Sequence, residues 1–246
     1  MEEEVRQVYR SRIKENFSEE DLEFLEGLIT SPYIDNTNDK ADAILYKFRE
    51  KNFIELAPAT NRFVLLKGKY VYKFALDKYG IKDNLNEFEM SEKLQPYVTK
   101  TYETNGLITI AEYVNLITEK EFMSSAPHIR NILKELSEDF IFCDIGTIPK
   151  NFTNYGFNDD DEIKILDYGY IYPKDPKILF CTKDGGNLVY TENYDQFVCT
   201  RCGEKYPVTD ILYRMSVSEE AYKKPKKKGS LVVKFKKKPN IGGFEV

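Results

Sequence analysis

Three of the four cysteines of this 246-residue chain lie close together near its carboxyl end. Cys199 and Cys202 form a Cys-x-x-Cys pair followed by Gly203, and two thiolates at this spacing can bind one tetrahedral ion above the turn that the glycine permits. The matching pair upstream consists of Cys181 and Asp184, and aspartate is an acceptable zinc ligand. The spacing predicts a Zn²⁺ site with three cysteines and one aspartate. The alternative is a degenerate site that holds no metal.

A second set of polar residues depends on elements that the periodicity predicts. Apolar residues recur at helical spacing over residues 5–13, 18–28 and 39–51, and Ser18 begins a capping sequence. The period changes near residue 53, where β-branched and aromatic runs flank the turn at Gly68 and predict a hairpin. The hairpin strands are 62–66 and 70–75, followed by a helix at 83–94, a strand at 107–114, a helix at 119–139, a loop at 144–158 and a strand at 162–166.

The polar residues follow these elements in a fixed order. Lys73 lies in the second hairpin strand, Glu87 on the next helix, Asn154 in the loop, and Asp167 directly after the last strand. A lysine, a glutamate and a metal-binding Asn/Asp pair in this order are the layout of a phosphoryl-transfer site of the protein-kinase kind. Over residues 53–173 the chain resembles kinase-fold proteins, and more narrowly the small kinase-like proteins of tailed bacteriophages.

This resemblance rests on the run from Pro58 to Arg62, on Val-Tyr-Lys ending at Lys73, and on Leu-Asp-Tyr-Gly from Leu166. It implies ATP and Mg²⁺ as ligands. Lys73 would bond the α- and β-phosphates while a helix glutamate holds it in place. The glutamate is assigned to Glu87, although the same helix carries two more. Asparagine and aspartate would hold the metal. An exposed strand lysine is the alternative for Lys73.

The resemblance also implies a catalytic loop at residues 144–158. Asp144 is the predicted base that orients a substrate hydroxyl, and Lys150 would neutralise the transferring phosphoryl group. No His-Arg precedes Asp144, and its distance in sequence from Asn154 is longer than in protein kinases. Asn151 lies between the two and is an alternative to Asn154, which is also a plausible turn residue beside glycine.

Two departures from the kinase pattern favour a second reading. Residues 55–61 contain no glycine, although a loop that covers phosphates needs glycine for close backbone approach. After Gly169 there is no Ala-Pro-Glu element and no run of further helices. Two functions are therefore predicted: an ATP-dependent kinase acting on a protein acceptor, or an inactive pseudokinase that serves as a phage structural or interaction module.

Charge divides the chain into an acidic body and a basic end. The formal net charge is −5, yet the part from residue 200 onward is net basic. The Lys-rich run predicts a nucleic acid or an acidic protein partner, and the alternative is a solvated terminus. No apolar run approaches the ~20 residues of a membrane span, and the acidic start is not a signal peptide. We expect a cytoplasmic protein, in the host if phage-encoded, with the virion as an alternative.

The expected fold class is α+β. The sequence predicts a reduced protein-kinase-like fold with a helical N-terminal cap and a C-terminal zinc-ribbon-like module. The expected boundaries are a helical region at 1–52, a kinase-like domain at 53–176, the ribbon-like module at 177–212 and a Lys-rich tail at 213–246.

Overall fold

The computed structural model is mixed helix and sheet, which confirms the α+β class. It describes residues 11–34, 36–58, 60–142, 145, 152–175, 177–191 and 194–223; the side chains of 57, 58 and 216–223 are not described. The predicted residues 5–10 of the first helix, the predicted catalytic residues Asp144 and Lys150, and most of the Lys-rich tail lie outside these ranges.

A five-stranded antiparallel sheet forms the centre of the amino-terminal part. Its strand order is β1-β2-β3-β5-β4. Strands β2 and β3 form the predicted hairpin around Gly68, whose φ of 60° lies in the left-handed region that favours glycine. The strands are β1 (Ile54–Pro58), β2 (Arg62–Lys67), β3 (Tyr70–Ala75), β4 (Thr101–Thr104) and β5 (Ile108–Glu112).

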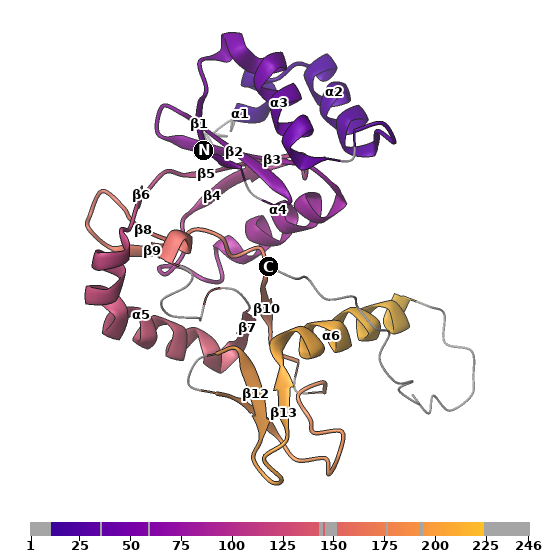
Figure 1. Ribbon diagram of the computed structural model, residues 1–246, viewed down its shortest axis with the longest axis vertical. Coiled ribbons are helices and arrows are strands. Elements are labelled where there is room, and N and C mark those ends of the chain that lie inside the picture. Colours follow the sequence, from indigo (N-terminus) through magenta and orange to yellow (C-terminus); the bar gives the residue numbers. More distant parts are fainter. Residues whose placement is uncertain are drawn as a thin grey trace, which may run out of the picture.

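Helices cover both faces of this sheet (Figure 1). On one face lie α1 (Arg12–Asn16), α2 (Glu19–Thr30) and α3 (Thr37–Phe48), with the short η1 (Arg49–Lys51). Their apolar side chains form one core with Phe63, Leu65, Tyr72 and Phe74 of the hairpin. Ser18 caps α2 with a full capping box, as its sequence predicts. The other face is covered by α4 (Lys78–Ser91), which begins five residues before the expected helix start.

Strand alternation decides which hairpin residues reach the α4 face. Successive side chains of a strand point to opposite faces. Because Phe63 and Leu65 of β2 and Tyr72 and Phe74 of β3 pack toward the N-terminal helices, Arg62 and Lys73 point toward α4. The apolar alternation of the hairpin therefore places two buried cations on the same side of the sheet.

The middle of the chain forms a second core around α5 (Glu119–Asp139), the predicted long helix. Pro127 and His128 both lie inside this helix. Small sheets flank the helix in the orders β6-β8-β9 and β10-β7. The elements are β6 (Asn115–Leu116), β7 (Phe140–Phe142), η2 (Phe152–Asn154), β8 (Tyr155–Phe157), β9 (Ile163–Ile165) and β10 (Ile171–Pro173).

A third core belongs to the cysteine-containing part, which consists of the three-stranded sheet β11-β12-β13 and α6 (Val208–Lys223). Its strands are β11 (Leu188–Tyr190), β12 (Gln196–Cys199) and β13 (Lys205–Pro207). Helix α6 runs across residue 213, where the sequence analysis places the start of the tail. Strand β7 joins two cores, because Ile141 belongs to this third core and Phe142 to the core around α5.

Candidate functional site

Lys73 and Glu87 form a buried ion pair between β3 and α4. The ammonium of Lys73 lies 2.7 Å from Oε2 and 3.0 Å from Oε1 of Glu87, and it donates a third bond of 2.8 Å to the Leu166 carbonyl. Asn84, one turn earlier on α4, donates to the Lys73 carbonyl and so ties the helix to the strand. Glu89 is exposed and pairs with Lys93 instead.

Arg62 is a functional candidate that the sequence analysis missed. Its guanidinium is 5% exposed and lies between two carboxylates. Nη2 is 2.6 Å from Oδ1 of Asp167, and Nη1 is 2.8 Å from Oε1 of Glu87. Arg62 and Lys73 thus share Glu87, and both are close to Asp167. The sequence signal that could have identified Arg62 is strand alternation, which places Arg62 and Lys73 on the same face of the predicted hairpin.

The charges of this cluster, defined here as Arg62, Lys73, Glu87 and Asp167, shift each other's protonation. Burial lowers the pKa of Lys73, and the attraction of Glu87 offsets this only in part. Burial would raise the pKa of Asp167, but Arg62 and Lys73 outweigh it and the net shift is downward. The pKa of Arg62 is raised by its two carboxylates in spite of burial. Asp167 is therefore an anion held by two cations.

The segment after β9 closes one side of the cluster. Tyr168 is fully buried, donates to the Thr99 carbonyl at 2.7 Å and shares a bond of 2.6 Å with Thr101. Gly169 lies so close to α4 that a Cβ there would come within 3.0 Å of the Asp83 Cβ. The Leu-Asp-Tyr-Gly run thus places Asp167 by an aromatic anchor on one side and a close backbone approach on the other.

Asn154 lies beside the residue that precedes Asp167. Its carbonyl accepts a 2.9 Å bond from the Leu166 amide, where η2 meets β8. The structure therefore brings Lys73, Glu87, Asn154 and Asp167 to one region. It gives no position for Asp144 and Lys150, which lie outside the described residues, as does the alternative Asn151.

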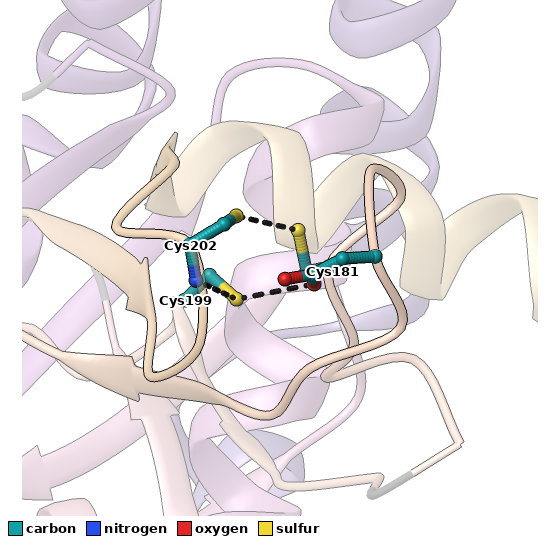
Figure 2. A group of neighbouring side chains, drawn as sticks. Cys181, Cys199 and Cys202 are labelled. Carbon is teal, nitrogen blue, oxygen red and sulfur yellow. Dashed lines mark hydrogen bonds between the residues drawn. The ribbon is translucent and has the colours of Figure 1, made fainter.

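Cys181, Asp184, Cys199 and Cys202 form a second cluster, the cysteine cluster. Their ligand atoms all lie within 4.8 Å of one another, close enough to hold one metal ion. Cys181 precedes β11, Cys199 ends β12, and Cys202 stands in the turn that leads to β13. Figure 2 shows the three cysteine side chains converging from these segments. This is the arrangement that the spacing predicts for a metal site.

The distances within the cysteine cluster match a tetrahedral ion. The Sγ atoms of Cys181 and Cys202 are 3.6 Å apart, and Cys199 Sγ is 3.4 Å from Asp184 Oδ1. A tetrahedron with Zn–S bonds of about 2.3 Å requires neighbouring sulfurs to be roughly 3.8 Å apart. The Gly186 amide donates to Asp184 and lowers the pKa of that carboxyl to about 2, so it is ionised and ready to bind a cation.

Neighbouring groups hold the cysteine cluster in place. Tyr206 of β13 contacts Cys181 Sγ at 3.2 Å and accepts a 3.1 Å bond from the Thr182 amide. Arg201 donates to the Asp184 carbonyl at 2.8 Å. At Gly186 a Cβ would lie 2.7 Å from the Cys199 sulfur, so only glycine fits there. These contacts and the close packing at Gly186 orient the four ligand groups toward one another.

Comparisons with known proteins give little. No family model matches the chain. No curated protein matches it. Among solved structures, a complex of Rv3197 with erythromycin from Mycobacterium tuberculosis has a TM-score of 0.37 and 13% identity. The match covers 65% of this chain and 58% of that one, so less than two thirds of the other protein is represented. Among the described residues, no helix has the length and apolar character needed to cross a membrane.

Proposed function

We propose that residues 53–176 form a reduced kinase-like domain that binds ATP at the cluster of Arg62, Lys73, Glu87 and Asp167. The observation that carries this proposal is the buried Lys73, which bonds both oxygens of Glu87 and the carbonyl just before Asp167. A lysine fixed in this way by a helix glutamate is the arrangement that kinase-fold proteins use to hold phosphates. The order of the motifs in the sequence supports the same reading.

Burial of the Lys73–Glu87 ion pair has an energetic cost, and a functional role would explain why the chain keeps the pair. Two charges removed from water lose several kcal/mol of solvation each, and a well-packed apolar pair would be at least as stable. Strongly perturbed, buried charges of opposite sign often mark a functional site. The lowered pKa of Lys73, caused by burial, fits a cation that is under-solvated and gains from a phosphate oxygen.

Mg²⁺ does not fit the arrangement around Asp167. The resemblance would give the ion to Asp167 and Asn154, where it would neutralise developing charge on the phosphates. Oδ1 of Asp167, however, is 2.6 Å from Arg62 Nη2, and Lys73 is nearby. This observation favours the pseudokinase alternative, in which the domain binds nucleotide and the chain acts by interaction. The test is transfer of labelled γ-phosphate to a protein acceptor, which we expect to be absent.

The ATP proposal is tested by calorimetric titration of ATP into the full chain with and without Mg²⁺. Lys73→Met should weaken binding by at least about tenfold, because a phosphate partner is lost. Lys93→Met is the matched control: it removes the same charge from an exposed position in the turn after α4, and binding should stay unchanged. Circular dichroism verifies that each variant folds. Failure of the folded wild type to bind ATP in either buffer would refute the proposal.

A structural Zn²⁺ ion in the cysteine cluster is the second proposal. It is supported by the four ligand atoms within 4.8 Å and by the sulfur spacing. A closed four-ligand site of this kind stabilises a fold and leaves no position for a substrate. Purified protein should contain one equivalent of zinc by mass spectrometry. Cys202→Ser should lose it, while Cys143→Ser, at the cysteine outside the proposed set, should keep it.

The proposal has three further parts. The chain is of phage origin, and its two parts are kinase-like and ribbon-like. The Lys-rich end binds a nucleic acid or an acidic protein partner. The Lys-rich run from residue 224 onward lies outside the described residues. Phosphate-driven binding to a nucleic acid would weaken steeply as salt is raised. A salt titration of binding to single- and double-stranded DNA tests that partner.

A further inference from the structure

Arg62 forms an ion pair with Asp167, the carboxylate that the kinase resemblance assigns as the metal ligand. Its Nη2 lies 2.6 Å from Asp167 Oδ1, while Nη1 is held 2.8 Å from Glu87. The backbone of Arg62 is fixed opposite Ala75 in the β2–β3 ladder, and its side chain is 5% exposed. Moving the guanidinium aside would leave the buried Glu87 carboxylate with Lys73 alone and would break the ion pair with the partly exposed Asp167. The position of Arg62 in the site is therefore fixed by its strand and by its two ion pairs.

A divalent ion at Asp167 would meet two fixed cations. Mg²⁺ binds carboxylate oxygens at about 2.0–2.1 Å, which would place it beside the guanidinium of Arg62. Lys73 already attracts the same carboxylate. Like charges at this range repel, and the burial of Arg62 and Lys73 limits the screening of their charges by water, while the Asp167 side chain itself is 42% exposed. The site thus opposes the ion that the family pattern expects, although it keeps the cations that a phosphate needs.

The guanidinium also has spare hydrogen-bonding capacity. The guanidinium has five N–H donors, of which Nη2 donates to Asp167 and Nη1 lies 2.8 Å from Glu87 Oε1 in an ion pair. A phosphate oxygen is a suitable acceptor for the N–H groups of the guanidinium that these two contacts do not use. The planar fork of arginine suits phosphate geometry. By pairing with Asp167, Arg62 also neutralises a carboxylate that would repel a triphosphate.

We infer that Arg62 takes the place of the divalent cation, so that this site binds a nucleoside triphosphate without metal, through the guanidinium of Arg62 and the ammonium of Lys73. The inference rests on the proposed ATP site and goes beyond it, because a site of the usual kind needs Mg²⁺ for tight binding. It also offers a substitute for the glycines that residues 55–61 lack: the Arg62 side chain, at the start of β2, would contact phosphate where a glycine-rich loop uses backbone amides.

The test compares ATP binding by the wild-type chain in two buffers, one with saturating Mg²⁺ and one freed of divalent ions by a chelating resin before protein is added. No chelator is added to the protein, so that the cysteine cluster keeps any metal that it holds. The affinities should agree within about threefold. Wild-type binding that is at least about tenfold tighter with Mg²⁺ would overturn the inference and leave the ATP site standing.

Two variants sharpen the comparison. Arg62→Gln should lose at least about tenfold in metal-free affinity and regain part of it with Mg²⁺, because Asp167 is then free for the ion. Arg49→Gln removes an exposed arginine of η1 that stacks on Tyr46 and should change neither value. Unchanged metal-free binding in folded Arg62→Gln would overturn the inference. Absence of wild-type binding in both buffers would refute the ATP site itself and the inference with it.

Discussion

Replacing Glu87 by glutamine should destabilise the protein far more than the same replacement two residues later. Glu87 is fully buried and faces two cations, with Lys73 at 2.7 and 3.0 Å and Arg62 at 2.8 Å. Glutamine keeps one oxygen but points an NH₂ group at one of the cations. Removing one partner of a buried ion pair costs about 3–5 kcal/mol in free energy of unfolding.

Glu89→Gln is the matched control. Glu89 lies on the same helix and pairs with Lys93 at 2.8 Å in an exposed i,i+4 contact. Such surface pairs contribute about 0.3–0.5 kcal/mol. The two variants therefore change the same functional group in the same helix, and burial is the difference between them. We expect the free energies of unfolding to differ by at least about 2.5 kcal/mol.

Urea denaturation followed by circular dichroism measures this difference, since the chain has no tryptophan for fluorescence. The midpoint should fall for Glu87→Gln with little change in slope. Adding Lys73→Met to Glu87→Gln should cost less than the sum of the two single changes, because the double variant leaves no unpaired lysine beside the glutamine. A difference between Glu87→Gln and Glu89→Gln below about 1 kcal/mol would refute the reasoning.

Three more predictions concern other parts of the molecule. Tyr168→Phe removes a buried hydroxyl that bonds Thr101 and a carbonyl, and should lower the free energy of unfolding by about 1–2 kcal/mol in urea denaturation; no change would contradict the role of this anchor. Cys202→Ser should lower the thermal unfolding temperature of zinc-loaded protein, and added chelator should then have little further effect. Burial would raise the pKa of Asp21, but the Ser18 amide and a nearby lysine lower it overall, so its stabilisation is complete above the ordinary aspartate pKa and is lost as pH falls through the lowered value. Asp21→Asn should therefore flatten the acid limb of stability against pH, and an unchanged limb would show that other groups cause it.

Local signals predicted the positions that depend on neighbours in sequence. The turn at Gly68 and the alternation around it predicted the hairpin, and the capping sequence at Ser18 predicted the start of α2. The Cys-x-x-Cys pair predicted where its partners Cys181 and Asp184 would lie, because one tetrahedral ion limits the geometry of four ligands. The pairing of Lys73 with Glu87 was implied by the resemblance to kinase-fold proteins.

Contacts between distant residues could not be predicted in this way. Arg62 looked like the first polar residue of a strand, because its role depends on Asp167, more than a hundred positions later. The short strands β7 and β10 pair across a long stretch of chain and carry no strong pattern of their own. Helix α6 was not predicted; its first turns contain apolar residues that pack against the cysteine part, which a boundary drawn at residue 213 from composition did not reveal.

The position of β7 limits how the parts of this chain can be exchanged. Ile141 packs into the core of the cysteine part, while the amide of the next residue, Phe142, donates to the hydroxyl of Tyr190 from that part. A recombination event that swapped only residues 177–223 for a foreign module would strip both contacts from a strand that the recipient had not changed. An exchange of the cysteine part would therefore keep both contacts only if β7, some forty residues upstream, were exchanged with it.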